Sequence, residues 1–139
     1  GSLTMDADSR EQTHSGATCT RFTYERLEGW TGVVWQDPPN DWGDRAGGFD
    51  LSGAPTLPFW VRGAMGGERV KFGFGIIPND KAFYDTATAE REVTLAPEWR
   101  RVEIGLKGKS LRRIKSGFWW VLGGQGAPVT FFLDDVRYE

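Results

Sequence analysis

The sequence predicts an all-β protein, a two-sheet antiparallel β-sandwich of the jelly-roll type. Short segments with alternating apolar and polar residues recur along the chain, and this is the period of a strand with one buried face. Turn-forming residues separate these segments, including 19 glycines, and no long segment has the period of a helix. Aromatic residues make up 14% of the chain, which supplies the large side chains of a sandwich core. With 139 residues, the chain is long enough for one domain with a substantial core.

The N-terminal residues differ from the rest in composition. Residues 1–18 are mostly small and polar, so we expect a flexible leader there, and Gly1-Ser2 resembles the remainder of an expression tag. The sandwich domain is expected over residues 19–139. Its first strand is predicted at 20–25, where polar and aromatic residues alternate, and its second at 33–36, after a glycine-containing turn.

The middle of the chain combines a long loop with two clear strands. Residues 37–48 are rich in Asp, Gly and Pro and predict a loop, and loops of this length in compact domains are usually functional or anchored. A strand is predicted at 56–62, with apolar side chains at every second position. After a hairpin loop, another strand is predicted at 68–77, with four apolar residues, the last of them Ile76, facing the core.

Four further strands complete the predicted sandwich, at 90–95, 100–106, 117–122 and 129–139. Two adjacent carboxylates, Asp134 and Asp135, interrupt the last of them, although Asp is unfavourable in strands. A bulge, a bound cation or a cap on a neighbouring loop explains such a pair.

Composition excludes several classes of function. The net charge of −2 provides no broad field for nucleic acid or an anionic membrane, and no apolar stretch is long enough to span a bilayer. We therefore expect no nucleic-acid and no membrane partner. The chain has one cysteine, Cys19, and one histidine, His14. An internal disulfide is excluded, and zinc sites of the Cys/His type and Cys–His or Ser–His catalysis are disfavoured.

Six short motifs follow one another along the chain: Asp50-Leu51-Ser52-Gly53-Ala54, Leu57-Pro58-Phe59-Trp60-Val61-Arg62-Gly63, Gly67-Glu68-Arg69-Val70-Lys71-Phe72, Leu95-Ala96-Pro97-Glu98-Trp99-Arg100, Gly117-Phe118-Trp119-Trp120 and Phe131-Phe132-Leu133-Asp134-Asp135-Val136. In this order they resemble the jelly-roll carbohydrate-binding modules of the galactose-binding-domain-like type. The resemblance implies two antiparallel sheets, a structural calcium, and a glycan site on a concave sheet face or at the loop tips. It also implies a secreted or cell-surface protein in which the module is joined to a catalytic domain.

The resemblance places the calcium ligands on the first strand, a nearby loop and an Asp near the C-terminus. Calcium takes six to eight oxygen ligands, and no EF-hand spacing is present, so the ligands must come from separate segments. The candidates are Asp134, Glu25, Asp50, Asn40, Asp41 and Asp44. Alternatively, these side chains form turns and cap loops.

The candidate glycan-binding residues are aromatic and basic side chains outside the predicted core. An indole ring can cover the apolar face of a sugar, while Arg, Asp, Asn or Gln side chains bond its hydroxyls. The candidates are Trp60, Arg62, Trp119, Lys71, Trp42, Trp35 and Tyr84. Trp60 and Trp119 alternate with core residues of their strands, and Arg62 shares a face with Trp60, with Lys71 expected close by. Ordinary packing and surface salt bridges are the alternatives.

We therefore predict a non-catalytic domain that binds a polysaccharide or oligosaccharide by aromatic stacking and hydrogen bonding. Two alternatives stay open: an accessory domain whose exposed tryptophans contact a protein, and a small polysaccharide-active enzyme with a pair of carboxylates.

Overall fold

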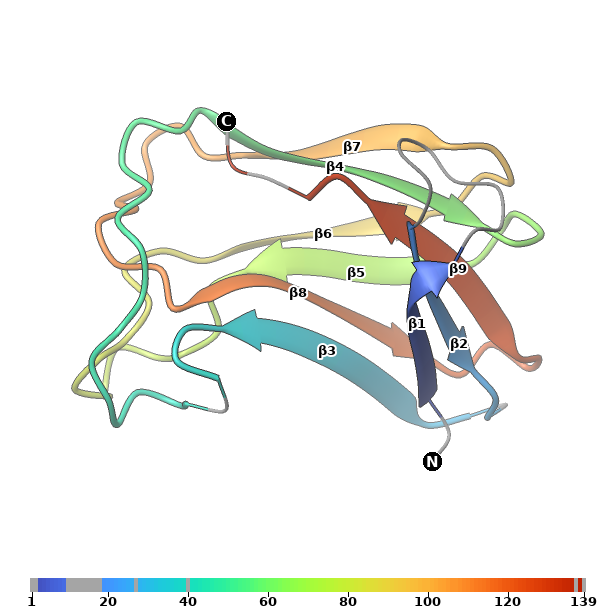
Figure 1. Ribbon diagram of the computed structural model, residues 1–139, viewed down its shortest axis with the longest axis horizontal. Coiled ribbons are helices and arrows are strands. Elements are labelled where there is room, and N and C mark those ends of the chain that lie inside the picture. Colours follow the sequence, from blue (N-terminus) through green and yellow to red (C-terminus); the bar gives the residue numbers. More distant parts are fainter. Residues whose placement is uncertain (1–2, 10–18, 27, 40, 137, 139) are drawn as a thin grey trace.

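The computed structural model describes residues 3–9, 19–26, 28–39, 41–136 and 138, and these form two antiparallel sheets packed face to face (Figure 1). A five-stranded sheet has the order β1-β2-β9-β4-β7, and a four-stranded sheet the order β3-β8-β5-β6. The strands are β1 (Leu3–Ser9), β2 (Cys19–Tyr24), β3 (Trp30–Gln36), β4 (Thr56–Gly63), β5 (Arg69–Phe74), β6 (Ala89–Thr94), β7 (Arg100–Gly105), β8 (Ser116–Gly123) and β9 (Val129–Asp134). The predicted all-β antiparallel sandwich is confirmed.

The period-2 pattern of the strands builds the core between the sheets. In β4, Leu57, Phe59 and Val61 are buried in the core, and in β8 Phe118 and Trp120 meet them from the opposite sheet. The ring centroids of Phe59 and Phe118 are 5.2 Å apart in an edge-on arrangement, which suits the charge distribution of aromatic rings. Burying these large rings is the main favourable contribution to folding.

The N-terminal segment differs from the expectation of a flexible leader. Leu3–Ser9 form strand β1, which pairs with β2 at the edge of the five-stranded sheet. Leu3 and Met5 alternate with polar residues, and Leu3 packs against the core. This alternation is the sequence signal for a strand that the polar composition obscured. The remainder of the predicted leader, residues 1–2 and 10–18, lies outside the described residues.

The strand predicted at 68–77 is shorter in the structure, and the prediction that Ile76 faces the core is wrong. Strand β5 ends at Phe74, and Gly75 follows with a φ of 72°, a conformation that glycine adopts without strain. Because the chain turns at Gly75, the alternation stops and Ile76 is 43% exposed.

The loop between β3 and β4, at the left of Figure 1, crosses one end of the sandwich. Phe49 within it forms an isolated antiparallel bridge with Ile114, so this loop is tied to the segment that leads into β8. The described part of the chain holds no helix that is long and apolar enough to span a membrane.

Candidate functional site

A cleft of about 630 Å³ opens between the two sheets. On one side lie the end of β9 and the segment after it, and on the other lie the end of β3, the loop after β3 and the start of β8. We call it the inter-sheet cleft. Its volume is within the usual range of small-ligand sites.

Aromatic side chains form much of the wall of the inter-sheet cleft. They are Trp35, Phe49, Phe118 and Tyr138. Trp35 is 42% exposed and Phe49 is 59% exposed. The Trp35 ring contacts Phe22 and Phe118, with ring centroids 6.3 Å and 5.7 Å away. These contacts hold the indole in place while part of it stays accessible to a ligand.

Tyr138 closes the cleft from the C-terminal side. Its hydroxyl donates a hydrogen bond of 2.6 Å to the carbonyl oxygen of Gly117 at the start of β8. Burial raises the pKa of Tyr138 well above its usual range, so the hydroxyl keeps its proton and its role as donor at neutral pH. The segment after β9 is thus joined to the four-stranded sheet.

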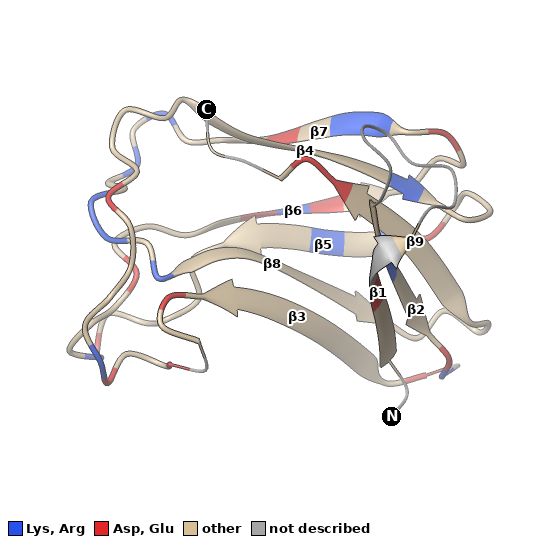
Figure 2. Ribbon diagram, viewed as in Figure 1, with Lys and Arg blue, Asp and Glu red and all other residues tan. Residues whose placement is uncertain are grey.

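Polar residues line the same cleft: Gln36, Asp37, Asp134 and Asp135. In Figure 2, acidic residues mark the end of β9 and the end of β3. One oxygen of Asp37 accepts the amide of Gly48 at 3.2 Å, and one oxygen of Asp134 accepts the amide of Asp135 at 3.0 Å. Asp135 has a φ of 53°, a left-handed conformation that Asp tolerates better than most residues. Carboxylate and amide groups of this kind can accept hydrogen bonds from sugar hydroxyls.

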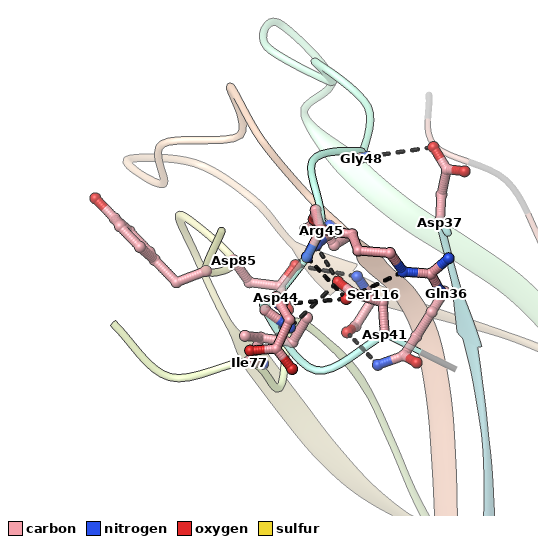
Figure 3. A network of polar contacts seen from close by, with 12 residues as sticks. Gln36, Asp37, Asp41, Asp44, Arg45, Gly48, Ile77, Asp85 and Ser116 are labelled. Atoms are coloured by element: carbon pink, nitrogen blue, oxygen red, sulfur yellow. Dashed lines mark hydrogen bonds and ion pairs between the residues drawn. The ribbon is translucent and has the colours of Figure 1, made fainter. Parts of the chain in front are cut away.

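The loop that forms one wall of the cleft is anchored by a buried ion pair. The ammonium group of Lys115 contacts the carboxylate of Asp41 and the carbonyl oxygen of Arg45, and both side chains of the pair are almost fully buried. Oxygens of Asp41 also accept the backbone amides of Gly43 and Arg45 at 3.2 Å and 3.0 Å (Figure 3). The hydrogen bond from Lys115 lowers the pKa of Asp41 to about 2.

A second buried carboxylate, Asp85, joins two further segments beside this loop (Figure 3). One of its oxygens accepts the amides of Ile76 and Ile77 at 2.9 Å and 3.0 Å. The other accepts the amides of Lys115 and Ser116 at 2.6 Å and 3.0 Å. Asp85 therefore links the end of the β5 region to the start of β8, next to the cleft.

The structure does not bring Arg62 and Lys71 close together, because they belong to different sheets. Trp60 and Arg62 alternate with the core residues of β4 and lie on the outer side of the five-stranded sheet. Arg62 is buried there, with its guanidinium 4.3 Å from the centre of the Phe132 ring and a 2.9 Å hydrogen bond to the carbonyl oxygen of Pro97. Because Arg62 is buried, its guanidinium is not exposed to a sugar, and the structure does not support the sugar-binding role predicted for it.

Trp119 and Lys71 lie on the outer side of the four-stranded sheet, opposite the face that carries Trp120 and Phe72. Trp119 is only 7% exposed, so its ring is packed rather than presented to solvent. Lys71 pairs with Glu90 at 3.7 Å on an exposed surface.

The remaining candidates belong to loops and to β3. Trp42 is 47% exposed in the loop after β3, and Tyr84 packs under the guanidinium of Arg113 at 4.7 Å. Trp35 is the predicted ligand residue that lines the inter-sheet cleft, together with the predicted metal ligand Asp134.

The described carboxylates among the predicted calcium ligands do not gather into one group of three or more. Among the residues that the structure describes, no three or more His, Cys, Asp or Glu side chains are close enough to hold a metal. Asp41 is engaged by Lys115, and Asp50 accepts the amide of Ser52 at 3.0 Å. Glu25 follows β2, Asp44 is exposed in the loop, and Asn40 lies outside the described residues. The described carboxylates by themselves therefore do not identify a calcium site.

Sequence reasoning missed Phe49, Tyr138 and Gln36 as cleft residues. Phe49 stands in a polar loop, where an isolated aromatic residue is a signal of either anchoring or binding. Tyr138 and Gln36 carried no such signal, because their position follows from how the ends of β9 and β3 meet.

No protein-family profile and no curated protein matches this sequence. Solved structures match its fold. One is the family 30 carbohydrate-binding module of a cellulosomal cellulase of Clostridium thermocellum, with a TM-score of 0.66 and 20% identity over 98% of this chain and 84% of that chain. Another is the family 11 carbohydrate-binding module of Clostridium thermocellum in complex with a β-1,3-1,4-mixed-linked tetrasaccharide, with a TM-score of 0.63 and 12% identity over 96% of this chain and 80% of that chain.

The fold also matches part of a much longer protein. An agarase aligns with a TM-score of 0.57 and 12% identity over 98% of this chain, but over only 23% of its own length. At these levels of identity the likeness concerns the fold. The chain has the fold of the β-sandwich carbohydrate-binding modules.

Proposed function

We propose that this domain is a non-catalytic carbohydrate-binding module and that it binds a polysaccharide or oligosaccharide in the inter-sheet cleft. The observation that carries the proposal is the combination, in one cleft, of the accessible residues Trp35 and Phe49 with the polar residues Gln36, Asp37 and Asp134. The similar folds of the family 30 and family 11 modules support it.

Binding would use two kinds of contact. The C–H face of a sugar ring stacks on an indole or phenyl ring, which removes apolar surface of both partners from water. The hydroxyls at the rim of the sugar donate hydrogen bonds to carboxylate oxygens, and bonds to a charged group are the stronger kind. Because few rings contribute, the expected affinity is modest, on the order of micromolar to millimolar.

The same proposal covers the wider context of the domain. We expect the domain to work as part of a larger secreted or cell-surface protein that acts on glycans, where it raises the local concentration of an attached enzyme on its substrate. The match to a short part of an agarase supports such an arrangement. A structural calcium also remains a proposal, which chelation tests.

Titration calorimetry with a panel of soluble polysaccharides and their oligosaccharides tests the proposed function. Trp35→Ala and Phe49→Ala should each weaken binding about tenfold, since each removes a stacking surface. Phe49→Ala is the cleaner variant, because Trp35 also packs on Phe22 and Phe118.

Trp30→Ala is the matched control. Trp30 is 74% exposed at the start of β3 and does not line the inter-sheet cleft. Binding lost with Trp30→Ala and kept with Phe49→Ala would move the site to the outer side of the four-stranded sheet. A wild-type protein that binds no glycan in the panel would overturn the proposed function. Release of reducing or unsaturated sugar ends from a bound polysaccharide would instead show an enzyme.

A further inference from the structure

Lys115 is a buried cation that takes no part in the proposed contacts with sugar. Its side chain is 0% exposed, and its ammonium group bonds the Asp41 carboxylate and the Arg45 carbonyl oxygen. The ring centre of Phe83 lies 5.5 Å from the same nitrogen. An ammonium group has three hydrogen-bond donors, and its burial costs free energy of desolvation. Two oxygens and an aromatic ring offset that cost here.

The partners of Lys115 both lie in the loop that forms a wall of the inter-sheet cleft. Asp41 first shapes that loop itself, because its oxygens accept the amides of Gly43, Asp44 and Arg45 at 3.2 Å, 3.2 Å and 3.0 Å. The ammonium then holds the shaped loop against the segment before β8. The Lys115 side chain thereby helps to fix the middle of the loop, where the carbonyl oxygen of Gly43 also accepts the amide of Phe83 at 3.0 Å.

Both ends of the same loop form backbone hydrogen bonds with Lys115 and with Ile114, the residue before it. The amide of Asp37 donates to the carbonyl oxygen of Lys115 at 2.8 Å. Phe49 and Ile114 exchange two hydrogen bonds of 2.9 Å each. Asp37 and Phe49 are the residues that this loop contributes to the cleft's polar and aromatic lining. Their positions therefore depend on residues 114–115.

A cation that gathers a carboxylate and a backbone carbonyl from one loop does what a structural calcium does in other proteins. The sequence predicted that Asp41 would serve a calcium ion, and in the structure Asp41 serves an ammonium group.

We propose that Lys115 is an internal cation that holds the wall of the inter-sheet cleft in its binding shape, and hence a positioning residue for the ligand. The effect on affinity rests on the proposed function, whereas the effect on the loop does not.

The physical reason is preorganisation. Without the ammonium, the loop samples other positions, and the ligand must select or restore the binding shape at a cost in affinity. Loss of the ammonium also leaves the buried Asp41 carboxylate with only the largely exposed Arg45 guanidinium, 3.8 Å away, which pushes the loop outward toward water. Lys115→Met keeps most of the side-chain volume and removes the charge, so it tests the ammonium rather than the packing.

The decisive experiment compares Lys115→Met with Gly73→Ala, a variant expected to lower stability from a site outside the cleft. Both proteins are assayed well below their melting temperatures by titration calorimetry with a glycan that the wild type binds, and by amide hydrogen exchange. Lys115→Met should lose about tenfold in affinity and should exchange the amides of Asp37 and Phe49 at least about tenfold faster. Gly73→Ala should change neither.

Lys115→Arg provides a second variant, since it restores a cation at the same place. It should recover part of both the affinity and the exchange protection. Equal losses of affinity in Lys115→Met and Gly73→Ala, or unchanged protection of Asp37 and Phe49 in Lys115→Met, would overturn the positioning role. If the wild type binds no glycan, the proposed function fails, and hydrogen exchange alone still decides whether Lys115 holds the loop.

Discussion

Gly73 of β5 lies directly against the indole ring of Trp119 of β8, its neighbour across the sheet. A Cβ atom at position 73 would lie 2.4 Å from a ring carbon of Trp119 and 2.5 Å from the carbonyl oxygen of Ala89. The indole nitrogen donates a hydrogen bond of 3.3 Å to the carbonyl oxygen of Gly75. Glycine at 73 therefore makes room for the ring of the same protein, and not for a ligand.

This contact predicts the effect of the smallest possible substitution. Gly73→Ala should destabilise the protein by about 1–3 kcal/mol, because the added methyl group meets a packed ring and a backbone oxygen that cannot both move away. Gly105→Ala is the control, since nothing lies within 4 Å of a Cβ at that strand position. Urea unfolding of both variants measures the difference. Equal stability of the two would show that Trp119 can shift without cost.

The buried pair of Lys115 and Asp41 predicts a pH dependence of stability. The pKa of Asp41 is about 2 in the folded protein, against about 4 for an ordinary Asp in the unfolded chain. The folded state therefore binds the proton less readily, so the pair stabilises the protein above pH ~4, and this contribution disappears as the pH falls from ~4 to ~2.

The wild type and Lys115→Met, compared by urea unfolding across this range, isolate the effect. The gap between their unfolding midpoints should be widest above pH ~4 and should narrow toward pH ~2. A gap that stays constant with pH would mean that Lys115 does not hold the pKa of Asp41 down.

We expect the substitution Asp85→Asn, which replaces one carboxylate oxygen by an amide nitrogen, to lower the stability of the protein strongly. Its two oxygens accept four backbone amides from two separate segments. Asp85→Asn replaces one acceptor oxygen by a donor that faces backbone N–H groups, so about 2 kcal/mol or more should be lost. The melting temperature measures this loss. The control is Asp80→Asn, an exposed position in the same connection, which should melt like the wild type.

Chelation tests the proposal of a structural calcium. A calcium bound to the native state would raise the melting temperature, and EDTA would lower it again. Since Lys115 already engages Asp41, an ion near the end of β9 would use Asp134 together with other oxygens, and EDTA should then lower the melting temperature. An unchanged melting temperature with EDTA and with added calcium would overturn the proposal.

The sequence by itself determined the class of fold and most of the core. Alternation in segments such as 57–61 and 118–122 identifies buried faces, because a strand places successive side chains on opposite sides and water is excluded from one of them. The same rule, applied to Leu3 and Met5, would have identified β1. Motif order along the chain also pointed to the sandwich of carbohydrate-binding modules, whose fold the structure shares.

Only the tertiary structure decided which residues meet. Trp60 and Trp119 have the same pattern in sequence, yet they lie on the outer sides of different sheets, and Trp119 is covered. Trp35, Phe49 and Tyr138 stand far apart in the chain and come together because the ends of β3 and β9 face each other across the gap between the sheets. Strand pairing order and the path of the long loop set such distances, and both arise from packing of the whole chain rather than from any local pattern.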